Sequence, residues 1–391
     1  MQYELNEDQL MFQDMVRRLT KEKIAPRAAA IDKEGKFPQD IYELFCENQL
    51  MGISFPEQYG GVGADFLTFC IAVEEIAVEC LNSALIPGIQ ELACTPLMIA
   101  CSLEQKKKYL PKLASGEWLG SFCLTEPGAG SDAASMKTKA ELKDDDYVIN
   151  GSKCFISEAD QAKVFTVFAK TDPGKGFKGI SAFIVEKDFP GISVGKHEDK
   201  MGSRGIAACE VIFEDCEVPK SNLLGNEGEG LKIAFQTLDK TRPLVGAAGV
   251  GLAQGALDYA IAYAKTRVQF NKPIAEFQGI QFKLADVAMQ IEAARQLVYK
   301  AAASIDKMDK ADAWNKSRKN QLEISKLGAM AKCFATDVAM KAALDAALVL
   351  GGYGYLKEYP MERHIRDARL LQIVEGTNDI QRMVMAETLF A

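Results

Sequence analysis

The sequence predicts an α+β protein of several domains, with helices at both ends of the chain and strands between them. The 391 residues are too many for one ordinary hydrophobic core. Helical periodicity dominates both ends, and the middle contains short β-branched and aromatic runs bounded by Gly, Pro and Asp. Separate blocks of helix and strand argue against a doubly wound sheet. We expect an N-terminal all-α domain (1–120), a middle β-barrel or sandwich domain (121–230) and a C-terminal four-helix bundle (231–391).

The N-terminal domain opens with a helix signal at Asn6. Asn6 is a strong N-cap residue, and Gln9 stands where the partner of a capping box is expected. A glycine-rich loop follows at residues 55–66, and the sequence from about residue 67 to 113 again predicts helix. We therefore predict a largely helical first third.

The middle domain is predicted from three strand-like runs, at residues 164–170, 180–186 and 210–219. Before them, Gly128, Gly130 and Ala133 fit a loose dinucleotide-binding fingerprint. That fingerprint requires a helix immediately after it, but the sequence that follows predicts strands and a turn. A plain structural turn remains possible here. The alternative is a cradle in which backbone N–H groups and the Thr125 and Ser131 hydroxyls hold a phosphate or a polar ring edge.

The last domain carries two apolar stripes at helical spacing, which we interpret as core-facing sides of long helices. The stripes are Leu284, Val287, Ile291, Val298 and Leu327, Met330, Phe334, Val338. The polar stretch 306–320 joins these two helices. Gly251 and Gly255 lie four residues apart in a predicted helix, and this spacing indicates close packing against another helix.

Composition restricts the chemistry. A net charge of -8 disfavours nucleic acid and anionic membranes as partners. The N-terminus resembles neither a secretory signal nor a transit peptide, and no apolar run approaches about 20 residues. Ten scattered cysteines without a CxxC pair suit buried free thiols in a reducing cytoplasm. With two histidines we expect no metal site and no His-based triad, so proton chemistry must rest on carboxylates, Lys, Tyr or a cofactor.

Seven motifs occur in one order and together resemble the acyl-CoA dehydrogenase family. They are LTEPGAGSD (124–132), NGSKCFIS (150–157), FEDCEVPKSNLLG (213–225), LDKTRPLVGAAGVGLAQ (238–254), TRVQFNKPI (266–274), LGGYGYLKEYP (350–360) and IVEGTNDIQR (373–382). The resemblance covers nearly the whole chain, and DKTRP makes it most similar to the short- and medium-chain members. It implies FAD bound between domains and between subunits of a homotetramer, an acyl-CoA substrate, and electron-transfer flavoprotein as the electron acceptor.

The resemblance places the catalytic base at Glu375. In this family a carboxylate removes the α-proton of the acyl thioester while the β-hydrogen leaves as hydride to flavin N5. Glu375 matches that carboxylate, and its backbone N–H matches one donor to the thioester carbonyl, with a flavin ribityl hydroxyl as the other. Burial beside an apolar substrate should raise the pKa of Glu375, which brings it nearer to the strength that the reaction needs.

Further contacts carry over residue by residue. The residues that match cofactor contacts are Thr125 (flavin pyrimidine edge), Ser131 (phosphates), Phe155 (beside the flavin), Ser157 (near N5), Arg267, Gln269 and Phe270 (a neighbouring subunit's FAD), Gly352 and Thr377. The substrate-binding candidates are Ser131, Asp239, Arg242, Val374 and Gly376, with Glu91 as a further candidate. Arg242 could equally belong to a structural ion pair.

Several positions depart from the family pattern. Val374 replaces a frequent Tyr and makes that wall of the pocket wider and apolar, and Leu348 replaces a Gln on the adenine side. Thr241 is not acidic, which excludes the subclass with its base on that helix. Glu91 lies in a segment that lines the acyl end of the pocket. It could be a capping or exposed acid, or a second carboxylate facing the far end of the substrate.

These observations favour an FAD-dependent dehydrogenase of a short- or medium-chain acyl-CoA. Two alternatives on the same scaffold stay open: a dehydrogenase of an alicyclic, cyclohexanecarboxyl-CoA type ester, and an enoyl-CoA reductase. An oxidase that passes electrons to O₂ is also open. A catalytically silent scaffold is disfavoured because Glu375, Thr125 and Arg267 are all present.

Overall fold

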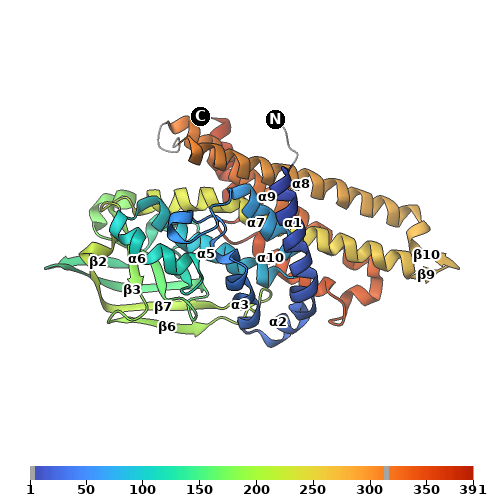
Figure 1. Cartoon of the computed structure of the whole chain (residues 1–391), viewed down its shortest axis with the longest axis horizontal. Helices are drawn as coiled ribbons and strands as arrows, with labels where there is room; N and C mark the ends of the chain where they lie inside the picture. Colours follow the sequence, from blue (N-terminus) through green and yellow to red (C-terminus); the bar gives the residue numbers. More distant parts are fainter. Residues whose placement is uncertain (1–4, 312–316, 391) are drawn as a thin grey trace.

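The computed structural model of the chain describes residues 5–311 and 317–390. A sheet forms one end of the molecule, the N-terminal helices lie at its centre, and two long helices extend to a small hairpin at the other end (Figure 1). This arrangement confirms the α+β fold class with its helical, sheet and helical parts. The domain boundaries at residues 120 and 230 stay predictions.

The N-terminal helices begin as the sequence predicts. Asn6 accepts a hydrogen bond from the Gln9 N–H, and the Gln9 side chain bonds back to the Asn6 N–H, so the capping box is formed. A π-helical turn, Thr20–Ile24, follows the first helix. The α-helices are α1 (Glu7–Leu19), α2 (Ala28–Glu34), α3 (Gln39–Glu47), α4 (Phe66–Ala77), α5 (Leu81–Ala100) and α6 (Leu103–Ala114).

The middle part is one eight-stranded sheet in the order β6-β7-β3-β2-β4-β5-β8, with β1 paired in parallel to β4. Its strands are β1 (Gly120–Cys123), β2 (Lys139–Lys143), β3 (Asp146–Ser157), β4 (Val164–Lys170), β5 (Ile180–Glu186), β6 (Ile192–His197), β7 (Ala208–Pro219) and β8 (Leu223–Leu224). The three predicted strands are therefore confirmed. A single 3₁₀ turn, Ala133–Ser135, stands where a dinucleotide fold would need a helix.

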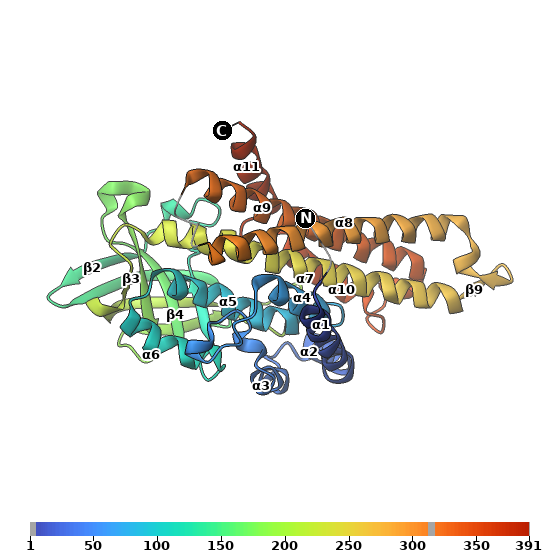
Figure 2. The same cartoon turned by 45° about the horizontal axis from the view of Figure 1, so that its top comes forward.

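In the residues that the structure describes, the C-terminal part contains three long helices and two shorter ones. They are α7 (Gly230–Thr266), α8 (Gln278–Lys310), α9 (Arg318–Leu350), α10 (Met361–Leu371) and α11 (Asn378–Leu389), and the strands β9 (Val268–Gln269) and β10 (Lys272–Pro273) form the hairpin between α7 and α8. Helix α9 packs against all four other helices, as Figure 2 shows for α7 and α8. The predicted polar stretch 306–320 lies where α8 ends at Lys310 and α9 begins at Arg318, so both of its ends are helical, and residues 312–316 lie outside the described residues.

The predicted apolar stripe of α9 is confirmed except at Phe334. Val287, Ile291 and Val298 of α8 are buried as expected, but Phe334 of α9 keeps 38% of its surface exposed. The buried side of α9 is rich in alanine, for example Ala331, and small residues let neighbouring helices approach closely. Leu327 and Val338 of this stripe are buried as predicted, whereas Phe334 lies at the margin of the contact, which periodicity alone does not reveal.

Two helices, α5 and α7, are long and apolar enough to cross a membrane by length and composition. In their most apolar windows 67% and 72% of the residues are buried inside the protein. Core helices pass the same test, and these two pack against each other and against α4. All ten cysteines are free thiols, which agrees with the predicted thiol chemistry, whereas a cytoplasmic location stays a prediction.

Substituting Gly251 with Ala should destabilise the contact between α4 and α7. A Cβ at Gly251 would lie 2.1 Å from the carbonyl oxygen of Glu74 in α4, so the helices must move apart. We expect a loss of about 2 kcal/mol, typical of overpacking, measured as a lower melting temperature. Gly279→Ala in α8 is the matched control, because a Cβ there meets no atom within 4 Å. A control variant that loses as much stability would contradict this explanation.

Candidate active site

Glu375 lies in a tight turn between α10 and α11. Its backbone has φ 51°, and Gly376 follows with φ 88°, so two successive residues adopt left-handed conformations. Thr377 ends the turn as the N-cap of α11 and accepts a hydrogen bond from the Ile380 N–H at 3.3 Å. For a glutamate, such a conformation costs about 1–3 kcal/mol and is typical of functional sites.

The Glu375 carboxylate is held by a helix 134 residues away in sequence. The Thr241 hydroxyl of α7 lies 2.7 Å from Glu375 Oε2 and also 3.1 Å from the carbonyl oxygen of Thr237. Burial raises the pKa of Glu375 to about 7, although the Thr241 hydrogen bond and the charges of Arg242 and Lys332 act in the opposite direction. A carboxyl group with this pKa is a stronger base than an ordinary glutamate and can take up a proton near neutral pH.

The backbone of the turn is restrained at its carbonyl oxygens. Gln381 Nε2 donates to the carbonyl oxygens of Glu375 and Gly376 at 3.1 and 2.9 Å, and Arg242 Nε lies 3.4 Å from that of Glu375. Within residues 5–311 and 317–390, the Glu375 N–H makes no hydrogen bond. The turn therefore presents a base and a backbone donor from the same residue.

Arg242 forms the structural ion pair that the sequence left open. Its Nη1 lies 2.6 Å from Asp239 Oδ1, and the Ser325 hydroxyl donates to the other Asp239 oxygen. Arg242 is 5% exposed. Burial raises the pKa of Asp239 although Arg242 opposes the shift. A substrate contact of either residue stays a prediction.

Glu91 corrects one interpretation. It is neither a cap nor an exposed acid, because it lies in the interior of α5 and is 1% exposed. Its carboxylate accepts hydrogen bonds from Ser54 at 2.5 Å and Thr95 at 3.2 Å. Burial raises its pKa, with Lys240 as the largest opposing influence. The apolar residues around Glu91 in the sequence indicate burial of the helix, but they do not show which side it turns inward.

The glycine loop and the end of β3 are joined into one unit. The Cys154 N–H donates to the carbonyl oxygen of Thr125 at 2.9 Å. Lys153, which is fully buried, pairs with Glu126 at 2.7 Å and also bonds the carbonyl oxygen of Leu124. The sequence analysis missed this ion pair. It holds the candidate Thr125 beside the candidates Phe155 and Ser157.

The glycine loop of this unit is open at two positions. A Cβ added at Gly128 or Gly130 would meet no atom within 4 Å, and Ser131 is exposed beside them. Phe155 leaves 65% of its surface exposed and has a left-handed backbone with φ 58°. An exposed aromatic ring next to an open glycine loop fits the flavin site that the resemblance implies.

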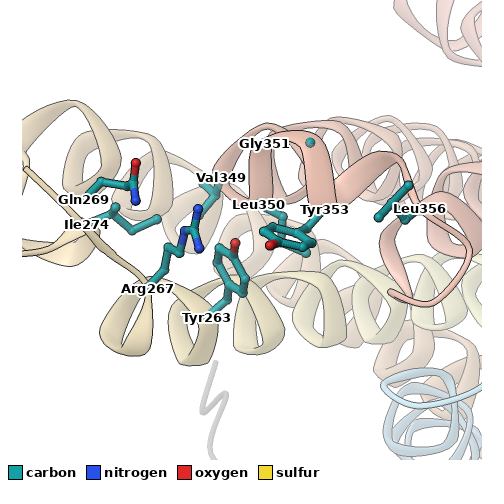
Figure 3. A pocket seen from close by; sticks show the side chains of 10 residues that line it. Tyr263, Arg267, Gln269, Ile274, Val349, Leu350, Gly351, Tyr353 and Leu356 are labelled. Carbon is teal, nitrogen blue, oxygen red and sulfur yellow. The ribbon is translucent and has the colours of Figure 1, made fainter.

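Arg267 and Gln269 line a pocket of about 530 Å³ at the hairpin end of the bundle (Figure 3). Gly352 lines the same pocket. The Arg267 guanidinium lies 5.3 Å from the Tyr353 ring centre. Phe270 is 88% exposed at the tip of the hairpin. In Figures 1 and 2 this end lies opposite the sheet, so one chain does not bring these residues to Thr125 and Phe155.

The remaining candidates lie near Glu375 or at the bundle surface. Val374 is half-buried and packs against the main core. Leu348 is 68% exposed. Lys332, which the sequence analysis also missed, is fully buried in α9 and donates to the carbonyl oxygen of Gly376 at 2.9 Å.

Comparison with known proteins gives the same family along the whole chain. The family models "Acyl-CoA dehydrogenase, N-terminal domain", "middle domain" and "C-terminal domain" match residues 6–117, 121–216 and 228–390. The chain is 46% identical to the "Acyl-CoA dehydrogenase" of Bacillus subtilis (strain 168), with 98% of each chain covered. It is 44% identical to the cyclohex-1-ene-1-carbonyl-CoA dehydrogenase of Syntrophus aciditrophicus (strain SB), with 99% of this chain and 91% of that one covered.

A solved structure extends the similarity to three dimensions. Butyryl-CoA dehydrogenase from Megasphaera elsdenii superposes with a TM-score of 0.94 at 42% identity, and 100% of both chains is covered. The chain therefore belongs to the acyl-CoA dehydrogenase family, whose members are FAD-dependent oxidoreductases that act on a CH–CH bond.

Proposed function

We propose that the protein dehydrogenates a short- or medium-chain acyl-CoA between its α and β carbons, with Glu375 as the base. The observation that carries the proposal is the Glu375 turn. It combines a carboxyl group whose pKa is raised to about 7 by burial with an N–H that no described residue engages. A thioester carbonyl at this N–H would gain enolate character while the carboxylate removes the α-proton.

Thr241 supports this proton transfer in both states of the base. Its single hydroxyl proton has two acceptors within reach, Glu375 Oε2 and the carbonyl oxygen of Thr237. The hydroxyl donates to the ionised carboxylate before the reaction. After Glu375 has taken the proton, the carboxyl O–H donates to Thr241, whose own proton turns to Thr237. The side chain of Glu375 thus stays oriented throughout.

Bound FAD supplies the acceptor for the hydride that leaves the β-carbon. We propose that Thr125, Ser131, Phe155 and Ser157 of one chain hold it, as the open glycine loop and the exposed ring suggest. The other residues proposed to contact FAD are Arg267, Gln269 and Phe270 of a neighbouring chain, with Gly352 and Thr377. The proposed substrate contacts are Ser131, Asp239, Arg242, Val374 and Gly376.

A homotetramer is part of this proposal. The hairpin candidates lie at the opposite end of the molecule from the sheet candidates, so a second copy must complete each cofactor site (Figure 1). The high exposure of Phe270 supports a role between chains. Electron-transfer flavoprotein is the electron acceptor that we expect.

A second candidate is dehydrogenation of an alicyclic acyl-CoA. Glu91 is a buried carboxyl group in the segment expected at the acyl end of the pocket, and its pKa is raised by burial. The 44% identical relative from Syntrophus aciditrophicus is named for a cyclic ester. If the substrate is cyclic, Glu91 would face a ring carbon.

An anaerobic titration with acyl-CoA esters tests the proposed function. The FAD-loaded protein is mixed with butyryl-, octanoyl-, isobutyryl-, glutaryl-, cyclohexanecarboxyl- and cyclohexenecarboxyl-CoA, and flavin absorbance is followed. We expect rapid bleaching by a linear ester. Bleaching by cyclic esters alone would support the second candidate, and an unchanged flavin with every ester would contradict both.

The rate should depend on pH through Glu375. The base works in its ionised form, so protonation lowers the rate. With a pKa of about 7, kcat/KM should fall about tenfold per pH unit below pH 7 and level off above it. The measurement is kcat/KM for the best ester across this range. A flat profile from about pH 5.5 to about pH 8.5 would contradict a free-enzyme base with this pKa.

A further inference from the structure

A buried lysine, Lys332, donates hydrogen bonds to both ends of the segment Gly376–Asn378, which directly follows Glu375. Lys332 lies on the buried side of α9 and has no exposed surface. Its Nζ donates to the carbonyl oxygen of Gly376 at 2.9 Å and to Asn378 Oδ1 at 2.8 Å. A buried ammonium group needs such acceptors, and here both belong to the turn that carries the candidate base.

The same helix also restrains the residues on both flanks of the turn. Gln372, before Glu375, donates to Asp337 Oδ1 at 2.7 Å, and Asn378, after it, donates to the same oxygen at 2.8 Å. Lys332 binds the Gly376 carbonyl oxygen, which lies between Gln372 and Asn378 in the sequence. The left-handed backbone of Glu375 is thus fixed from α9 by hydrogen bonds on each side and at the next carbonyl oxygen.

The charge of Lys332 is not neutralised by a bonded carboxylate. Both of its hydrogen-bond acceptors are neutral oxygens, and no salt bridge of Lys332 occurs in the described part of the chain. The charged or titratable groups that influence it are Glu375, Cys333, Arg242 and Asp337, and Glu375 has the largest influence among them. Asp337 already pairs with Arg382 at 2.8 Å, and Arg242 pairs with Asp239. Glu375 is therefore the carboxylate left to balance the ammonium charge.

We propose that Lys332 is the positioning residue of the catalytic base: it holds the turn at Gly376 and Asn378, and its charge favours the ionised form of Glu375. This inference rests on the proposed role of Glu375. Burial lowers the pKa of Lys332 to about 8, so the ammonium group is still charged at pH 7. Loss of the charge should make Glu375 harder to ionise, and loss of the hydrogen bonds should loosen the turn.

Two substitutions separate charge from position. Lys332→Gln retains a donor for the turn without the charge, and Lys332→Met retains the approximate length without either. In the FAD-loaded enzyme we expect the inflection of the kcat/KM–pH profile to move to higher pH in both variants. Lys332→Gln should regain most of its rate at high pH. Lys332→Met should stay roughly 10- to 100-fold slower, because the turn has then lost its hydrogen-bond donor as well as the charge.

The controls make each outcome decisive. Lys341→Met removes an exposed lysine from the same helix and should leave both the profile and the rate unchanged. Flavin absorbance and the melting temperature report folding. If Lys332→Met does not fold, the pH profile and the rate of Lys332→Gln provide the test. An unmoved inflection in Lys332→Gln would overturn the role of the charge, and a full rate in folded Lys332→Met would overturn the positioning role. A fully active Glu375→Gln would instead remove the proposed function itself.

Discussion

Replacing Glu375 with Gln should lower kcat by roughly 10²–10⁴-fold, the typical contribution of a general base. Gln has nearly the same volume, and its amide oxygen can still accept the Thr241 hydrogen bond. It cannot take up the α-proton. FAD content, measured by absorbance, and binding of the acyl-CoA ester should both be retained, because the backbone of the turn is held by Gln381 and Arg242 rather than by the carboxylate.

Asp379→Asn is the matched control for this change. Asp379 lies in the first turn of α11, four residues after Glu375, and its side chain is 94% exposed. The control should keep a kcat within about twofold of the unmodified enzyme, because the only ion pair of Asp379 among the described residues, with Arg382 at 3.5 Å, is exposed and such pairs contribute little. A Glu375→Gln variant that turns over at the unmodified rate would remove Glu375 as the base.

Arg242→Met should have the largest effect on stability. The substitution removes one partner of a buried ion pair and leaves Asp239 without its charge partner at 2.6 Å. Removing one member of such a pair typically costs about 3–5 kcal/mol, since the remaining charge stays buried. Loss of the Arg242 contact at the Glu375 carbonyl oxygen should also lower kcat/KM. We expect a melting temperature several degrees lower and a reduced kcat/KM for the best ester.

Arg27→Met distinguishes a buried pair from an exposed one. Arg27 pairs with Asp40 at 2.7 Å, close to the 2.6 Å of the Arg242–Asp239 pair, but both of its side chains are open to solvent. An exposed pair contributes about 0–1 kcal/mol, so this variant should melt close to the unmodified protein. Equal destabilisation by the two substitutions would show that the burial of Arg242 is not the reason for its effect.

The fold class and several local structures could be predicted from the sequence because their signals are local. The Asn6–Gln9 capping box depends on residues three apart, and β4 and β5 are runs rich in β-branched and aromatic residues that correspond to residues 164–170 and 180–186. Gly251 indicated close helix packing. The structure confirms it, because a Cβ added at Gly251 would lie only 2.1 Å from the carbonyl oxygen of Glu74. The order of the motifs predicted the family, and the comparisons confirm it.

The depth and the neighbours of the site residues could not be predicted in this way. Glu91 allowed an exposed or a pocket-facing interpretation, and its burial is set by Ser54 and by the packing of α5. Phe334 follows the expected spacing, but it keeps 38% of its surface exposed, although Leu327 and Val338 of the same stripe are buried.

By itself, the sequence determined the family, the α+β architecture and Glu375 as the candidate base. The tertiary structure decided what surrounds that base: Thr241 lies 134 residues from it, and Lys332 lies 44 residues from Gly376. Such contacts depend on how α7 and α9 pack against the turn, and no periodicity in either helix specifies them. Burial and charge act through space, so the raised pKa of Glu375 is a property of the folded chain and not of its local sequence.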